Sequence, residues 1–168
     1  MRSILLVEDN PDDEALTLRA FTKNNMLNDV TVARDGAEAL ELLFADRSAP
    51  LPGLILLDLS IPKVSGLEVL SRIRADQRTR LVPVVILTTS KEQEDVLAGY
   101  SGGANAYVRK PLKFADFTAA MKVLGMFWLL LSEGPPDPAE AQTGLAEPSP
   151  DITGPPAASE MPPVTTGD

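Results

Sequence analysis

Five side chains that could do chemistry stand at the ends of short apolar segments of the chain. They are Glu8, Asp9, Asp58, Thr88 and Lys110. The sequence contains no cysteine and no histidine, so thiolate and imidazole nucleophiles or metal ligands are excluded. The remaining carboxylates, hydroxyl and ammonium can hold a hard cation such as Mg²⁺ and can support phosphoryl transfer onto a carboxylate.

Each of these residues taken alone has an ordinary structural explanation. An acid that follows a strand is usually a turn or a helix cap, and this applies to Asp58. Lys110, which precedes a proline, could be a surface lysine, and Thr88 could be a hydroxyl at a helix entry. Their joint occurrence at the ends of successive strands favours a functional site.

The apolar segments alternate with helical patterns through most of the chain. The expected strands cover residues 3–7, 30–33, 54–57, 83–87 and 106–108. The first expected helix begins at residue 11, and the other four cover residues 36–45, 66–75, 92–99 and 114–131. This alternation predicts an α/β fold with a five-stranded parallel sheet covered by helices on both faces. Folds of this kind place their chemistry outside the carboxyl ends of the strands.

The first helix has a clear start signal. Asn10 is the expected N-cap and Pro11 suits the first helical position. The first turn carries three acids, which the helix dipole favours there, namely Asp12, Asp13 and Glu14. The expected inner face of this helix consists of Leu16, Ala20 and Phe21.

The net charge of −9 is concentrated in one part of the chain. Residues 134–168 hold six acids, no lysine or arginine and nine of the fifteen prolines, which leaves −9 − (−6) = −3 for residues 1–133. We therefore expect a folded domain over residues 1–133 and an acidic, Pro-rich, disordered tail over residues 134–168. A docking segment is the alternative for the tail.

Several locations and partners are disfavoured by the sequence. There is no basic surface pattern for nucleic acid and no apolar run long enough to cross a membrane. The N-terminus has no secretory signal. The sequence therefore predicts a soluble, cytoplasmic protein.

Residues 2–131 resemble the receiver domain of response regulators in two-component signalling. The segments that carry the resemblance are LLVEDNPDD, LILLDLSIPKVSG, PVVILTTS and ANAYVRKP. The spacings agree as well, since Asp58 precedes Thr88 by 30 residues and Thr88 precedes Lys110 by 22. The resemblance implies a flavodoxin-like (βα)5 receiver fold with an extended final helix.

The resemblance also implies a role for each residue of the site. Asp58 is the expected phosphoacceptor, and a sensor histidine kinase is expected to supply the phosphoryl group. Lys110 is expected to pair with that group. Asp9, Asp58 and the backbone carbonyl of Ser60 are the expected Mg²⁺ ligands, with Glu8 acting through water. Glu8 departs from the commoner aspartate but keeps the carboxylate. By this resemblance the chain is a phosphoacceptor switch and acts as a catalyst only on its own phosphorylation and dephosphorylation.

The output is expected to follow from a change around the phosphoryl group. By the same resemblance, Thr88 is expected to turn toward it and Tyr107 to move into the vacated space, which would alter the surface made by the fourth helix, the fifth strand and the fifth helix. An ordinary half-buried aromatic is the alternative for Tyr107. In this family the positions of Ser60 and Ser90 tune the phosphoryl lifetime. Both side chains are small, and we hypothesise an open path for attacking water or for a phosphatase.

We expect no second folded domain from this sequence, so the expected output is a protein contact. The final helix has an apolar seam whose first half packs on its own sheet, whereas its last turns are apolar nearly all round. We expect a symmetric homodimer through Phe127, Trp128 and Leu131. The MFWLLL ending and the NPDDEALTLRAF segment are similar to single-domain regulators paired with bacterial phytochromes.

Two other classes of protein share parts of this pattern. A haloacid-dehalogenase-like phosphatase is also phosphorylated on an aspartate of its own. That family requires a second acid two residues after this aspartate, where this chain has Ser60. A flavodoxin-like cofactor carrier needs a phosphate-binding loop after the first strand, where this chain has Glu8 and Asp9. A degenerate receiver is disfavoured because all five site residues are present.

Overall fold

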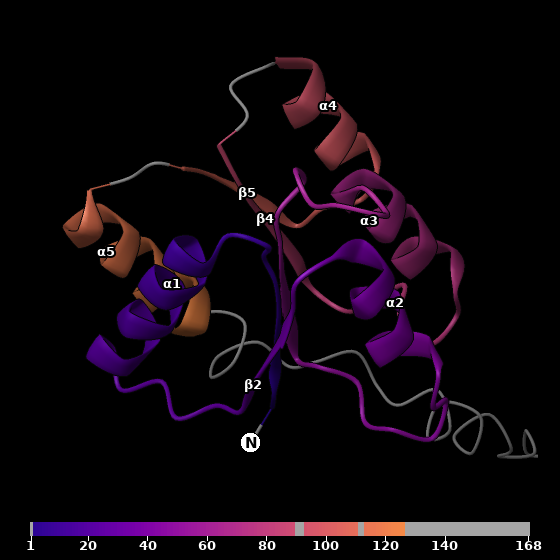
Figure 1. The fold of residues 1–168 in the computed structure, drawn as a ribbon, viewed down its shortest axis with the longest axis horizontal. Helices are drawn as coiled ribbons and strands as arrows, with labels where there is room; N and C mark the ends of the chain where they lie inside the picture. The colour runs from indigo at the N-terminus through magenta and orange to yellow at the C-terminus, as the bar shows by residue number, and fades with distance from the viewer. Residues whose placement is uncertain (1, 90–92, 111–112, 127–168) are drawn as a thin grey trace, which may run out of the picture. The chain divides into compact units, whose positions relative to one another are not determined.

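The computed structural model describes residues 2–89, 93–110 and 113–126, in which strands alternate with helices (Figure 1). The strands are β1 (Ile4–Val7), β2 (Val30–Ala33), β3 (Leu54–Leu57), β4 (Val84–Thr88) and β5 (Ala106–Arg109). The helices are α1 (Pro11–Lys23), α2 (Gly36–Phe44), α3 (Gly66–Ala75), α4 (Gln93–Ser101) and α5 (Phe114–Gly125). The order of elements predicted from the sequence is confirmed.

The strands form one parallel sheet in the order β2-β1-β3-β4-β5. Helices α1 and α5 cover one face, and α2, α3 and α4 cover the other, as Figure 1 shows. Parallel neighbours require crossover connections, and the helices supply them. The predicted α/β class and five-stranded parallel sheet are therefore confirmed.

The ends of β4 and β5 differ from the expected ranges by one residue each. Thr88 is the last residue of β4 and pairs with Arg109, the last residue of β5. Thr88 is β-branched and fits a strand, so the sheet extends to it. Helix α4 continues to Ser101, two residues beyond the expected end.

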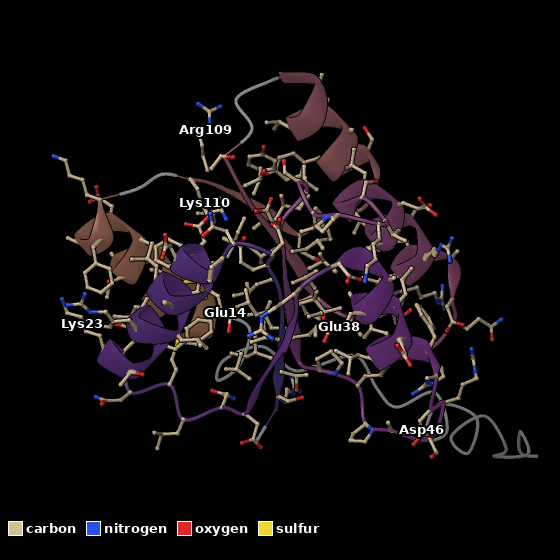
Figure 2. All side chains as sticks on the ribbon, in the orientation of Figure 1. Glu14, Lys23, Glu38, Asp46, Arg109 and Lys110 are labelled. Carbon is tan, nitrogen blue, oxygen red and sulfur yellow. The ribbon has the colours of Figure 1, made fainter. Side chains whose placement is uncertain are left out.

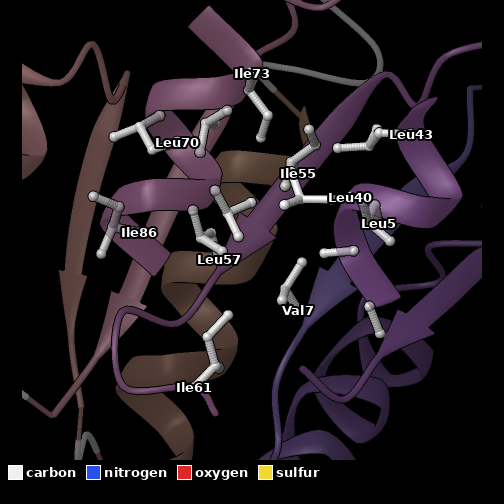
Figure 3. Close-up of a cluster of buried hydrophobic side chains, with 14 of the residues drawn as sticks. Leu5, Val7, Leu40, Leu43, Ile55, Leu57, Ile61, Leu70, Ile73 and Ile86 are labelled. Atoms are coloured by element: carbon white, nitrogen blue, oxygen red, sulfur yellow. The ribbon is translucent and has the colours of Figure 1, made fainter. Parts of the chain in front are cut away.

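The side chains of the strands alternate between two separate apolar clusters because successive residues point to opposite faces. Figure 3 shows the cluster on the α2 and α3 side, where Leu5, Val7 and Leu57 meet Leu40 and Leu70. Strands β1, β3 and β4 are buried along their whole length, which explains why their sequences are almost entirely apolar. Within these three strands a polar side chain comes only at the carboxyl end, at the last residue of β4.

The second cluster lies between the sheet and helices α1 and α5. Phe117 and Met121 of α5 are 1% exposed and pack there with Ala20 and Phe21 of α1. Leu16 also packs against this cluster but is only partly buried. Thr17 is the more buried residue, at 2% exposed, and its hydroxyl donates to the Asp13 carbonyl at 2.9 Å. The sequence did not predict a buried threonine on this face.

Side-chain caps fix where three of the helices begin. The Asn10 side chain accepts hydrogen bonds from the backbone amides of Asp12 and Asp13, as predicted. Asp35 and Ser65 cap α2 and α3 in the same way. These caps determine the position at which each helix leaves the carboxyl edge of the sheet.

No helix within the described residues is both long and apolar enough to cross a membrane. The predicted boundary between a domain of residues 1–133 and a tail of residues 134–168 lies outside the described residues, as does the predicted part of the final helix beyond residue 126. Both remain predictions.

Candidate functional site

The register of the sheet brings the ends of three strands together. Val7 of β1 pairs with Leu57 of β3, so Glu8 and Asp58 leave the sheet side by side. The Asp58 amide donates to the Val7 carbonyl at 3.0 Å, and the Lys110 amide donates to the Thr88 carbonyl at 2.7 Å. Backbone hydrogen bonding therefore continues one residue past β1, β3 and β5. It fixes the backbone positions of the residues whose side chains form the site.

The Lys110 ammonium lies at the centre of this site and contacts three carboxylates. Its Nζ donates to Glu8 Oε2 at 2.6 Å, to Asp13 Oδ2 at 2.9 Å and to Asp58 Oδ2 at 3.0 Å. Figure 2 shows the Lys110 side chain near the start of α1, whereas the neighbouring Arg109 points away from the site. The predicted convergence of Glu8, Asp58 and Lys110 is confirmed.

Burial and charge act together on the Lys110–Glu8 pair. Both residues are almost fully buried, at 4% and 2% exposed. Burial raises the pKa of the Glu8 carboxyl, although the Lys110 ammonium opposes this shift. Burial also opposes the charge on Lys110, but hydrogen bonds to Glu8 and Asp13 and the charge of Asp58 outweigh it and raise the Lys110 pKa. The ammonium therefore stays charged over the whole neutral range.

The Asp58 carboxylate is held from both sides. Its Oδ1 accepts a hydrogen bond from the Ser60 amide at 2.9 Å, and its Oδ2 accepts the one from Lys110. Glu8 is held similarly, because its Oε1 accepts from the Asn10 amide at 3.1 Å. Two fixed carboxylates next to one ammonium are suited to binding and orienting a charged reactant.

Three carboxylates in this region could hold a metal ion. One oxygen from each of Glu8, Asp9 and Asp58 lies within 4.8 Å of the others, and Asp9 is exposed while the other two are buried. Carboxylate oxygens with an open side toward water are the ligands that Mg²⁺ and Mn²⁺ prefer. The donor set therefore fits the predicted divalent cation. The predicted role of the Ser60 carbonyl stays a prediction.

Thr88 and Tyr107 lie on the sheet face that α3 and α4 cover. Thr88 is fully buried, and Tyr107 pairs in register with Ile86, two residues before Thr88. Residues two apart on a strand share a face, so the threonine and the tyrosine ring lie on the same side. The Tyr107 ring is also 6.5 Å from the Tyr100 ring of α4. This placement is consistent with the predicted pair of switch residues, whose movement stays a prediction.

The remaining predicted residues divide into two groups. Ser60 is exposed, and its backbone amide contacts the site by donating a hydrogen bond to Asp58. Ser90, Phe127, Trp128 and Leu131 lie outside the described residues.

Asp13 is a site residue that the sequence analysis missed. The helix dipole explained it as an ordinary first-turn acid, yet its carboxylate contacts Lys110. The available signal was its position four residues after Asp9, in the first turn of a helix that starts at the carboxyl edge of the sheet. That turn faces the same edge as Glu8 and Asp58.

Gly66 is a second residue that the sequence analysis did not single out. It begins α3 directly against the backbone of Asp58 and Leu59. A Cβ placed at Gly66 would overlap the Asp58 carbonyl oxygen and would come within 2.6 Å of the Leu59 Cα. The absence of a side chain there lets α3 approach the backbone that carries Asp58.

This combination of fold and site is that of a known family. Residues 4–122 match the response regulator receiver domain family, and the chain belongs to it. Two relatives match this chain over most of their own length. The probable methanogenesis regulatory protein FilR2 of Methanothrix harundinacea is 40% identical, over 79% of this chain and 86% of its own. Response regulator Rcp1 of Synechocystis is 36% identical, over 75% of this chain and 88% of its own.

Among the solved structures similar to this chain are several response regulators that belong to phytochrome systems. The phosphorylated cyanobacterial phytochrome response regulator RcpA has a TM-score of 0.74 at 35% identity, over 80% of this chain and 98% of its own. The bacteriophytochrome response regulator AtBRR has a TM-score of 0.64 at 48% identity, over 79% and 99%. The Mn²⁺-bound form of Rcp1 has a TM-score of 0.73 at 34% identity, over 80% and 99%. The chain's close structural neighbours are thus phytochrome response regulators.

The close approach at Gly66 leads to a stability prediction. In Gly66→Ala the new methyl group meets backbone atoms that cannot move independently, so we expect a loss of about 1–3 kcal/mol in the free energy of unfolding. Urea denaturation measures this quantity. Gly99→Ala is the matched control, because its Cβ would come close only to the tip of the Ile86 side chain, at 2.7 Å, and would lie at an ordinary contact distance of 3.8 Å from the Tyr107 ring. We expect a change of less than about 1 kcal/mol there, since alanine also favours the helix. Equal losses in the two variants would contradict the prediction.

Proposed function

We propose that this protein is a response regulator that accepts a phosphoryl group on Asp58 from a sensor histidine kinase, in a reaction that depends on Mg²⁺. The observation that carries the proposal is the contact of Lys110 with both Glu8 and Asp58 beside an acidic cluster. A fixed carboxylate, an ammonium and a divalent-cation donor set are the components that phosphoryl transfer onto an aspartate requires.

The chemistry follows from how Asp58 is held. One carboxylate oxygen attacks the phosphorus of the donor, and the bond from phosphorus to the donor's nitrogen or oxygen breaks. The electron pair of that bond leaves with the donor, which is a histidine imidazole or an acetate ion. The Ser60 amide and the Lys110 ammonium keep the carboxylate in position and oppose the growing negative charge.

The residues that would hold the cation are Glu8, Asp9 and Asp58, with the carbonyl of Ser60 as the expected fourth donor. A bound Mg²⁺ would supply positive charge for the oxygens of the phosphoryl group and so lower the repulsion by the acidic cluster. The Mn²⁺-bound structure of Rcp1 supports this proposal.

The expected signal is a change at the surface around α4, β5 and α5, read by another protein. Thr88 is the proposed donor to the phosphoryl group, and Tyr107 the proposed residue that follows it. The phytochrome regulators among the structural neighbours support a phytochrome-type kinase as the partner. In this reading the protein is a switch and does not turn over a separate substrate.

Intact-mass spectrometry after incubation with acetyl phosphate tests the proposal. We expect one phosphoryl group on the wild type when Mg²⁺ is present, and none on Asp58→Asn or in the presence of a chelator. Asp12→Asn, which changes an exposed acid of the same edge, should behave as the wild type. Failure of the wild type with both acetyl phosphate and a phosphohistidine kinase domain would refute the function.

The lifetime of the phosphoryl group tests the proposed tuning positions. Because Ser60 is small and exposed beside Asp58, Ser60→Leu should shield the carboxyl phosphate from water and lengthen its half-life. The same is expected of a bulky replacement at Ser90. The rate at which the phosphoryl mass is lost after removal of the donor measures the half-life. An unchanged rate in both variants would contradict the proposed role of these positions.

We also propose that the protein forms a symmetric homodimer through the end of the final helix, at Phe127, Trp128 and Leu131. The described residues that lead to this segment support an apolar surface, because Val123 is 66% exposed and Met126 is 45% exposed. Sedimentation velocity should show a dimer that the double variant Phe127→Ser, Trp128→Ser converts to a monomer. Leu42→Ser removes an exposed leucine of α2 and is expected to leave the dimer intact. A monomeric wild type would contradict the proposal.

A further inference from the structure

Asp13 is the third carboxylate that contacts Lys110, and it has no assigned part in phosphoryl transfer. Asp13 Oδ2 lies 2.9 Å from Lys110 Nζ, a distance comparable to that of Asp58. Within the described residues, the group of oxygens close enough to share a metal ion comprises Glu8, Asp9 and Asp58 and does not include Asp13. The contact of Asp13 at this site is therefore with the lysine.

All hydrogen-bond donors of the Lys110 ammonium are in use. A lysine ammonium has three N–H groups, and three carboxylates accept from it. A phosphoryl group on Asp58 brings further charged acceptor oxygens to the same place. These oxygens compete with carboxylates that already hold the ammonium, so one of the existing contacts must weaken.

The three partners of Lys110 differ in how easily they can be released. The side chains of Glu8 and Asp58 are 2% and 8% exposed, whereas that of Asp13 is 30% exposed. A buried carboxylate that loses its partner remains desolvated, while an exposed one exchanges its partner for water at little cost. Asp13 is thus the partner whose contact is most easily exchanged.

The backbone of Asp13 is fixed although its carboxylate reaches water. Its amide donates to the Asn10 side chain at 3.3 Å, and its carbonyl accepts from the Thr17 hydroxyl at 2.9 Å. These contacts in the first turn of α1 aim the carboxylate at the carboxyl edge of the sheet. Release of Lys110 therefore requires rotation of one side chain and no movement of the helix.

We propose that Asp13 is a positioning residue that holds the Lys110 ammonium beside Asp58 in the unphosphorylated protein and gives it up to the phosphoryl group. This inference rests on the proposed phosphoryl transfer to Asp58. The carboxylate of Asp13 has opposite effects on the two ions that the site receives. It attracts a divalent cation and repels the anionic phosphoryl group.

The variant Asp13→Asn removes this charge and keeps a neutral acceptor of nearly the same shape. We expect its Mg²⁺ dissociation constant to rise about three- to tenfold, as the loss of one nearby charge at intermediate dielectric implies. At saturating Mg²⁺ we expect its phosphorylation by acetyl phosphate to become faster by a similar factor, because the repulsion is smaller and Lys110 is more available. Asp13→Glu restores the charge and should return both quantities toward the wild type.

Asp12→Asn is the matched control. It removes the same charge from the same helical turn, but the carboxylates that contact Lys110 do not include Asp12. The experiment uses the full chain and three readouts: calorimetric Mg²⁺ binding, phosphorylation rate by intact mass, and the nitrogen NMR signal of the Lys110 ammonium without metal. In Asp13→Asn this signal should shift and exchange faster with water, and in Asp12→Asn it should stay unchanged.

The outcomes separate this inference from the proposed function. Opposite changes in Mg²⁺ affinity and phosphorylation rate, with a shifted Lys110 signal, support the role of Asp13. Equal behaviour of Asp13→Asn and Asp12→Asn overturns it, and so does a parallel loss of both quantities, which indicates a structural role only. A shifted Lys110 signal in a protein whose wild type accepts no phosphoryl group supports the holding contact and overturns phosphoryl transfer itself.

Discussion

The contact of one buried ammonium with three carboxylates is the interaction on which the site depends. Glu8 and Asp58 are buried at the sheet edge, where two unpaired charges would repel each other and lose hydration. Lys110 donates a hydrogen bond to each of them, and the cost of its own burial is offset by the same contacts. Removal of the ammonium would leave two buried carboxylates without an opposite charge. The acids and the lysine are therefore a single electrostatic unit, to which the proposed cation and phosphoryl group would be added.

The parallel sheet explains why this unit can exist at all. Strands β1 and β3 are apolar on both faces, so charged groups are excluded from them and collect where these strands end. The register aligns the ends of β1 and β3, and backbone hydrogen bonds extend the alignment to Asp58 and Lys110. Gly66 lets α3 approach the backbone of Asp58 closely. Hydrogen bonds thus fix the backbone of the site, whereas the side chains of Asp9 and Asp13 reach water.

Much of this arrangement could be predicted from the sequence because strand ends and motif spacing are local signals. The ends of the apolar segments alone predict that Glu8, Asp58 and Lys110 lie at one edge. Asp13 was missed because a first-turn acid already has a sufficient local explanation, and its contact with Lys110 spans 97 residues. The burial of Thr17 was missed because its hydroxyl is satisfied by the backbone of its own helix, which hydrophobic periodicity does not reveal. Both omissions concern partners, which a pattern of residue types does not specify.

The distance along the chain between the partners has a consequence for folding. Lys110 and Glu8 are 102 residues apart, and Lys110 follows the last strand of the sheet. Until β5 has joined β4, the acids at the ends of β1 and β3 have no ammonium between them, and closure of so long a loop is slow relative to local contacts. A chain emerging from the ribosome therefore carries these acids without the Lys110 ammonium until its final strand is made. The ammonium reaches the acids only in a molecule whose sheet is complete.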